Sequence, residues 1–155
     1  MKTGIIRRID NLGRIVIPKA IRKDMKIKSG DSIEITENKD AIYLKKYSEL
    51  ENIESIGNII IQLLKGLNNS DIYITTRDKI ILSSKRNYIQ NLPNKIITLI
   101  EKRNFYINDN RNIIVSPIVS SGDLYGSIIV KSNSAIKNIE IIKIMTELLS
   151  KYLED

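Results

Sequence analysis

The residues that could carry chemistry in this chain are basic side chains rather than nucleophiles or metal ligands. The sequence contains no Cys and no His, so it lacks thiolate nucleophiles, disulfides, the commonest metal ligand and the usual general base near neutral pH. Its Asp and Glu residues show no spaced pair that would single out a general acid and base. We therefore expect no enzyme, no metal site and no cofactor. The 25 Lys and Arg residues exceed the 18 Asp and Glu residues and leave a net charge of +7, which favours a polyanionic partner.

The excess charge is concentrated in the first third of the chain. Residues 1–47 contain 12 basic and 6 acidic residues, whereas residues 48–155 contain 13 and 12. Such asymmetry predicts two units with different partners, at residues 1–47 and 48–155. A solvated Lys-rich surface would give the same bulk charge, so the placement of the Arg residues carries more weight than the total.

Short elements are predicted in the first unit. Pro18 fits the first turn of a helix because its missing N–H costs nothing there, and the Asp-Asn-Leu-Gly stretch at residues 10–13 is a typical turn. The predicted order ββαββ consists of strands at residues 4–9 and 14–17, a helix at 18–25, and strands near 33–36 and 41–46. The helix would gather its cations opposite Ala20, Ile21 and Met25.

A unit of this size needs a partner. Fewer than 50 residues without a disulfide or a metal rarely hold a stable core alone. Interleaving the strands of two chains solves this problem, so we expect an obligate dimer. Its doubled cationic surface has two-fold symmetry, which suits duplex DNA.

The strings KTGIIRRID (residues 2–10), LGRIVIP (12–18) and IRK (21–23) resemble the N-terminal DNA-binding domain of the AbrB family. The resemblance implies a domain-swapped dimer with the swapped-hairpin fold, which binds DNA through basic side chains of its loops and short helices. Carried over position by position, the implied DNA-binding residues are Arg7, Arg8, Arg14, Arg22 and Lys23. Relatives carry Arg where this chain has Lys23, so a bidentate contact becomes a point-charge contact. Lys2 and Lys19 are further candidates for phosphate contacts, and Arg14 has the alternative of a surface residue that caps the turn.

The second unit reads as a layered α+β domain. Apolar residues recur at helical spacing from about residue 47 to Leu67. The predicted order αββαββα continues with strands at 71–75 and 79–83, a helix at 88–102, strands at 112–119 and 124–131, and a helix at 136–153. The sheet is expected to be antiparallel. Together with residues 114–130, this order resembles a GAF domain. The resemblance implies a sensor and oligomerisation domain whose first and last helices assemble two dimers into a tetramer.

An AbrB-like head followed by a GAF-like tail is similar to sporulation regulators of endospore-forming bacteria. The resemblance implies a sequence-tolerant transcription regulator, activator or repressor, whose partners are double-stranded DNA and further copies of itself. The sequence leaves open whether the tail binds a small molecule. The aromatic residues that could line such a pocket are Tyr73, Tyr88, Phe105, Tyr106 and Tyr125. The alternatives are a small-molecule sensor and an antitoxin-like autoregulator, although antitoxin tails are disordered and this one is too apolar for disorder. No apolar run approaches the roughly 18 residues of a spanning helix, and no signal segment is visible. We therefore expect a cytoplasmic protein, associated with the nucleoid or the forespore.

Overall fold

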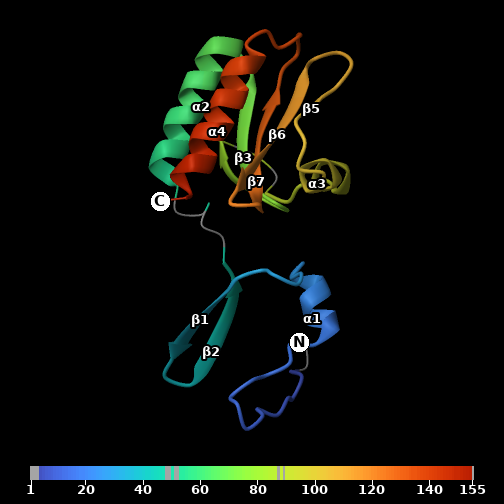
Figure 1. Cartoon of the computed structure of the whole chain (residues 1–155), viewed down its shortest axis with the longest axis vertical. Helices are drawn as coiled ribbons and strands as arrows, with labels where there is room; N and C mark the ends of the chain where they lie inside the picture. The colour runs from blue at the N-terminus through green and yellow to red at the C-terminus, as the bar shows by residue number, and fades with distance from the viewer. Residues whose placement is uncertain (1–3, 48–49, 51–52, 87, 89, 155) are drawn as a thin grey trace. The chain divides into compact units, whose positions relative to one another are not determined.

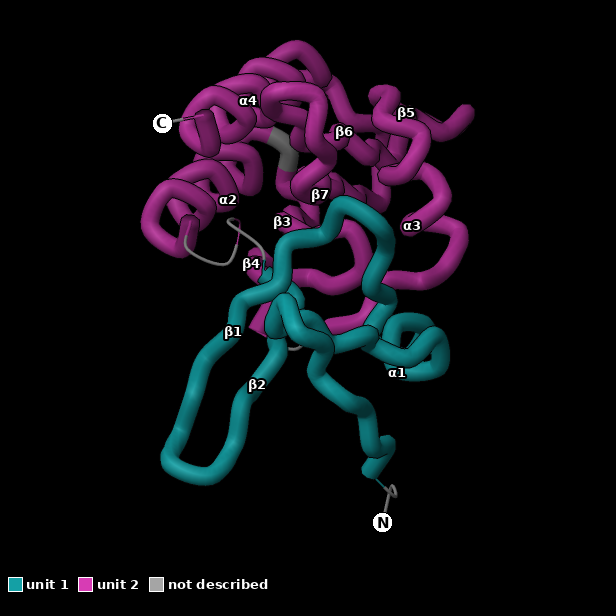
Figure 2. The backbone as a smooth tube through the Cα atoms, turned by 60° about the horizontal axis from the view of Figure 1, so that its bottom comes forward, with its two compact units in different colours: residues 1–47 teal, residues 48–155 magenta. Residues whose placement is uncertain are grey.

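The computed structural model describes residues 4–47, 50, 53–86, 88 and 90–154 (Figure 1). The chain forms two compact units, residues 1–47 and residues 48–155, which Figure 2 draws in different colours. We refer to the first unit as the head and to the second as the tail.

The ordered elements of the head are one short helix and one hairpin. Helix α1 covers Lys19–Asp24, and strands β1 (Ile33–Asn38) and β2 (Ala41–Lys46) pair in antiparallel fashion. The alternating apolar residues predicted both strands, and this prediction is confirmed. Ile35 lies opposite Leu44 in the register, so the apolar residues of the two strands share one face of the hairpin.

The strands predicted at residues 4–9 and 14–17 are absent from the described part of the single chain. Residues 4–10 and 14–18 have no regular secondary structure, although the turn between them is well formed. A strand exists only when its backbone N–H and C=O groups pair with a neighbour, and these segments have no such neighbour within one chain. The prediction was therefore wrong for the isolated chain.

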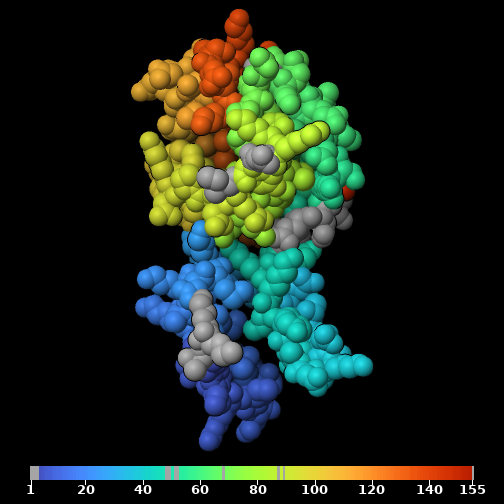
Figure 3. Space-filling view, turned by 180° about the vertical axis from the view of Figure 1, so that it is seen from behind, coloured from blue at the N-terminus to red at the C-terminus, as the bar shows by residue number. Residues whose placement is uncertain are grey.

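The head has no interior of its own. Among residues 4–47, none is buried, and Ile6 and Leu12 are 90% and 75% exposed. Figure 3 shows these residues, blue to cyan, in a space-filling view. A unit with this much exposed apolar surface cannot offset the entropy of ordering its backbone.

The tail is a five-stranded antiparallel sheet with helices on both faces (Figure 1). Its strands lie in the order β4-β3-β7-β6-β5. The elements in chain order are α2 (Glu54–Asn68), β3 (Asp71–Thr76), β4 (Ile80–Ser83), α3 (Asn94–Glu101), β5 (Tyr106–Ile107), β6 (Ile113–Ser120), β7 (Asp123–Lys131) and α4 (Ile139–Tyr152). The αββαββα prediction and the antiparallel sheet are confirmed, with the two-residue strand β5 as an addition.

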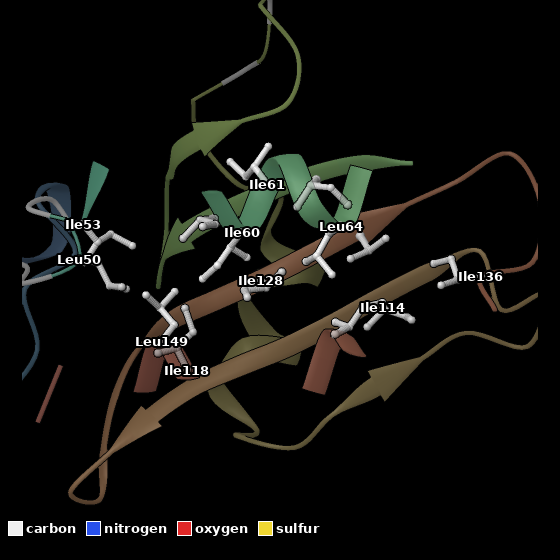
Figure 4. Close-up of a cluster of buried hydrophobic side chains, with 14 residues drawn as sticks. Leu50, Ile53, Ile60, Ile61, Leu64, Ile114, Ile118, Ile128, Ile136 and Leu149 are labelled. Atoms are coloured by element: carbon white, nitrogen blue, oxygen red, sulfur yellow. The ribbon is translucent and has the colours of Figure 1, made fainter. Parts of the chain in front are cut away.

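Two hydrophobic layers hold the tail together. Helices α2 and α4 lie side by side on one face, where Ile60, Leu64 and Leu149 meet Ile114 and Ile128 of the sheet (Figure 4). Helix α3 covers the opposite face with a second cluster. Along β7 the side chains alternate between the two layers, as the period of a strand requires. Each fully buried Ile or Leu contributes roughly 1.5–3 kcal/mol relative to an exposed one.

Two helices of the tail begin later than the sequence predicts. Helix α3 starts at Asn94 rather than at residue 88, and α4 starts at Ile139 rather than at residue 136. The backbone N–H of Ile80 donates to Gln90 and that of Leu92 donates to Asp78, so residues 90–92 pair with the β3–β4 turn instead of winding into a helix. Part of the predicted start of α2, residues 48–49 and 51–52, lies outside the described residues.

Candidate nucleic-acid interface

The five predicted DNA-binding residues all lie in the head and are all exposed. Arg7 and Arg8 belong to the first extended segment, and Arg14 follows the turn at residues 10–13. Arg22 and Lys23 stand in the last turn of α1, where cations are favoured by the helix dipole. All five side chains are therefore accessible to a polyanion.

The turn before Arg14 is organised by one carboxylate. Asp10 Oδ1 accepts the backbone N–H groups of Leu12 and Arg14 at 2.9 and 2.8 Å, and Asp10 Oδ2 accepts the side-chain Nε–H of Arg14 at 2.8 Å. Gly13 adopts φ +77°, the left-handed region in which a side chain would be strained. Hydrogen bonds from the backbone and side chain of Arg14 lower the pKa of Asp10.

The alternative reading of Arg14 as a turn residue and its predicted role in DNA binding are compatible. Its Nε is engaged by Asp10, yet 72% of the side chain is exposed. A guanidinium carries five N–H donors, so an arginine held through Nε keeps the donors of both Nη groups for another partner.

Helix α1 ends through backbone geometry that fixes Arg22 and Lys23. The N–H of Lys26 donates to the carbonyl of Lys23 at 3.1 Å, and the N–H of Ile27 donates to that of Arg22 at 2.7 Å. Lys26 adopts φ +53°. These two bonds, together with the left-handed conformation of Lys26, form a Schellman motif. The carbonyls at this end of the helix are thereby satisfied, and the two cationic side chains extend from an anchored backbone.

One cation of the head has a structural role that the sequence analysis missed. Lys46 Nζ lies 3.4 Å from Asp31 Oδ2 and donates to the carbonyl of Lys26 at 3.2 Å. Asp31 also accepts the backbone N–H of Lys28 at 2.8 Å, and only 4% of its side chain is exposed. These bonds fasten the loop after α1 to the end of β2. The pairing of Asp31 with a lysine of β2 has no local signature in the sequence.

The aromatic residues weighed as a ligand pocket in the tail are not brought together. Tyr73 and Tyr106 pack against the cluster beneath α3, whereas Phe105 and Tyr125 pack against the cluster beneath α2 and α4. Tyr88 is exposed. The tail has a shallow cavity of about 240 Å³ lined by Leu50, Glu54, Ile81 and Leu82, which is smaller than typical ligand sites of 300–1,000 Å³.

The buried polar groups of the tail satisfy one another. The hydroxyl oxygens of Thr75 and Ser127 lie 2.8 Å apart, and Thr146 Oγ1 lies 2.8 Å from Ser116 Oγ. Among the described residues, no buried side-chain nitrogen or oxygen lacks a hydrogen-bond partner.

In the described part of the chain, no group of three or more acidic residues is placed to hold a metal ion. Across the same residues, no helix is both long and apolar enough to span a bilayer.

Comparison with known proteins assigns the two units. Residues 6–51 match the family model described as antidote-toxin recognition MazE, bacterial antitoxin. Stage V sporulation protein T of Bacillus subtilis (strain 168) is 31% identical, and the match covers 84% of this chain and 84% of that protein. The chain belongs to the stage V sporulation protein T family. The transition state regulatory protein AbrB of the same organism is 33% identical and covers 58% of this chain and 94% of its own length.

The tail of this family member has a solved structural counterpart. The cofactor-binding GAF domain of the nutrient sensor CodY from Clostridium difficile matches with a TM-score of 0.50 at 12% identity, over 87% of this chain and 94% of that one. At this identity the likeness concerns the fold alone. The predicted architecture is confirmed: an α+β protein with an AbrB-like head and a GAF-like tail.

Proposed function

We propose that this chain is a sequence-tolerant, DNA-binding transcription regulator. The observation that carries the proposal is the placement of Arg7, Arg8, Arg14, Arg22 and Lys23, all of them exposed in the family-matched head. Lys and Arg contacts to phosphates supply affinity that is independent of sequence. A six-residue helix is too short to read a long base sequence, so base preference is modest.

The binding form of the head is a domain-swapped dimer. None of residues 4–47 is buried in the single chain, and the apolar face of the β1–β2 hairpin has no cover within it. A second copy supplies that cover and the missing partners of residues 4–9 and 14–17. Two-fold symmetry then repeats the cations for two positions along a duplex.

The tail assembles dimers into a tetramer. Helices α2 and α4 each carry an apolar stripe on the side away from the sheet, and its members are between 47% and 58% exposed: Ile59, Leu63 and Leu67 on α2, and Ile144, Leu148 and Tyr152 on α4. Their spacing of four residues places each stripe on one helix face. Two copies of this helix pair bury both stripes and link two heads, which raises DNA affinity through avidity.

The family match with stage V sporulation protein T supports sporulation genes as the targets. A regulator of such genes acts on the chromosome, which places the protein in the cytoplasm of an endospore-forming bacterium, at the nucleoid or in the forespore. The likeness of the tail to a GAF domain supports a further role in sensing a signal, beside assembly.

The test is binding of the full-length chain to duplex DNA, followed by fluorescence anisotropy at increasing salt. If the complex makes 6–10 phosphate contacts, affinity falls by about 10³–10⁵ between roughly 50 and 200 mM salt. Arg14→Ala and Arg22→Ala each weaken binding and leave the thermal melt unchanged. Arg86→Ala, which removes an exposed arginine of the tail, serves as the control. Wild-type affinity in both head variants contradicts the assignment of the site.

An antitoxin-like autoregulator is the second candidate, because the family model that matches residues 6–51 describes bacterial antitoxins. Antitoxins of this kind neutralise a toxin with a disordered segment, whereas this tail has two buried cores. Co-expression with toxins encoded beside the gene discriminates the two functions, since a regulator without a toxin partner gives no protection. A small-molecule sensor, the remaining alternative, would reveal itself by a ligand that raises the melting temperature of the tail.

A further inference from the structure

An acidic residue at the start of the turn that precedes Arg14, a predicted DNA-binding residue, requires an explanation. Asp10 lies directly beside Arg14, and a carboxylate near a phosphate backbone opposes binding over the Debye length of about 8–10 Å. If Arg14 bound only phosphates, the head would bind DNA more tightly without this charge. The carboxylate therefore contributes something other than affinity.

The hydrogen bonds of Asp10 indicate what that contribution is. Through Leu12 and the backbone of Arg14 the carboxylate fixes the turn, and through Nε it fixes the guanidinium on the same turn. Nη1 and Nη2 then form the free end of the side chain, with reduced rotational freedom. Two parallel N–H donors held at this end match the O6 and N7 acceptors of guanine in the major groove.

The other predicted cations lack this arrangement. Within residues 4–47, no carboxylate forms an ion pair with Arg7, Arg8, Arg22 or Lys23. Arg7 Nη1 donates only to the adjacent carbonyl of Ile6, at 3.5 Å. Phosphate contacts require charge rather than orientation, so these four side chains suit them. Among the five predicted DNA-binding cations, Arg14 alone is therefore held by a carboxylate.

We propose that Asp10 is a positioning residue that orients Arg14 to read a guanine edge, while the remaining cations bind the DNA backbone. The inference rests on the proposed function and deepens it, because it assigns base preference to one side chain of the same site. The Asp10 carboxylate also repels DNA phosphates. A variant without this charge should therefore lose base preference while its overall affinity for DNA stays equal or increases.

The experiment begins with duplexes that the full-length protein enriches from a randomised library. Each guanine of an enriched duplex is replaced in turn by 7-deazaguanine, which lacks the N7 acceptor, and affinities are measured by anisotropy. Loss of one of the two hydrogen bonds weakens wild-type binding by between about threefold and tenfold at the guanine that is read. Asp10→Asn, which has nearly the same shape without the charge, reduces this factor to below about twofold. Its affinity for an unrelated duplex stays equal or increases.

Two further variants separate orientation from folding. Arg14→Lys keeps the charge and leaves Asp10 in place but removes the planar two-donor fork, so it reduces the 7-deazaguanine effect even though the turn residue Asp10 is unchanged. Asp40→Asn removes the same charge from the β1–β2 turn, and it keeps the full effect.

Three outcomes overturn the inference. They are enriched duplexes without any guanine dependence, an unchanged 7-deazaguanine effect in Asp10→Asn and Arg14→Lys, and an equal loss of affinity for all duplexes in Asp10→Asn. A wild-type protein that binds no duplex at all contradicts the proposed function instead.

Discussion

Replacing Ile35 with Ala tests the dependence of the head on a second copy. Ile35 lies on the apolar face of β1 opposite Leu44, and 69% of its surface is exposed in the single chain. Full burial of an Ile is worth roughly 1.5–3 kcal/mol, so covering the exposed two thirds contributes about 1–2 kcal/mol per chain. A symmetric dimer counts this twice, which gives about 2–4 kcal/mol. At 1.4 kcal/mol per factor of ten, the dimer weakens by roughly 30- to 700-fold.

The assay is sedimentation equilibrium of the full-length chain over a wide dilution range. Contacts between tails are removed beforehand by Leu63→Glu together with Leu148→Glu, so that the head alone governs dimerisation. Tyr43→Ala is the matched control, because Tyr43 is a large exposed side chain on the opposite face of the same hairpin. We expect it to change the dissociation constant by less than about threefold.

Two results would refute this reasoning. The first is a head that stays monomeric at every concentration and still binds DNA like the parent, since no second copy is then needed. The second is an equal effect of Ile35→Ala and Tyr43→Ala, which would indicate nonspecific adhesion rather than burial of one defined face.

Three more outcomes are expected. Gly126→Ala should destabilise the tail in urea unfolding by more than about 3 kcal/mol, because the new Cβ would lie 1.8 Å from a backbone carbonyl oxygen of β3. Gly66→Ala is the control: there is open space around its Cβ, so it should stabilise α2 by about 0.5–1 kcal/mol. Leu63→Glu and Leu148→Glu should each reduce the mass measured by light scattering to that of a dimer, without lowering the melting temperature of the tail. Because the pKa of Asp10 is lowered, its stabilisation of the turn should be complete above about pH 4 and be lost only as the pH falls through that lowered pKa. An NMR titration of the Gly13 amide checks this. A change of the amide signal between pH 5 and 8 would contradict it.

Patterns confined to one element were the ones that the sequence predicted well. Strands β1 and β2 follow from alternating apolar residues, and α2 and α4 follow from helical spacing. The types of the candidate site residues were equally accessible, because a dense motif positions Arg7, Arg8 and Arg14 around one turn. What these residues bind was inferred from charge and resemblance, and it stays a proposal.

Features that depend on distant partners escaped prediction. The late start of α3 depends on backbone bonds between residues 90–92 and 78–80, and strand β5 exists only because β6 lies beside it. The same holds for Lys46, which the sequence presents as one more surface cation. Its bond to Asp31 spans 15 positions, a separation at which composition and periodicity contain no information.

The strands predicted at residues 4–9 and 14–17 belong to this second group, with one difference. Their apolar residues point to partners, yet the chain supplies none: Ile9 and Ile15 remain 66% and 51% exposed. A sequence that encodes half of a pairing is consistent with selection on the pair rather than on the single chain. If residues 4–9 and 14–17 pair only in the dimer, the turn between them is held at both ends only there. Asp10 already orients Arg14 within one chain, so dimerisation would repeat this oriented arginine by two-fold symmetry, and a monomeric head would present only one.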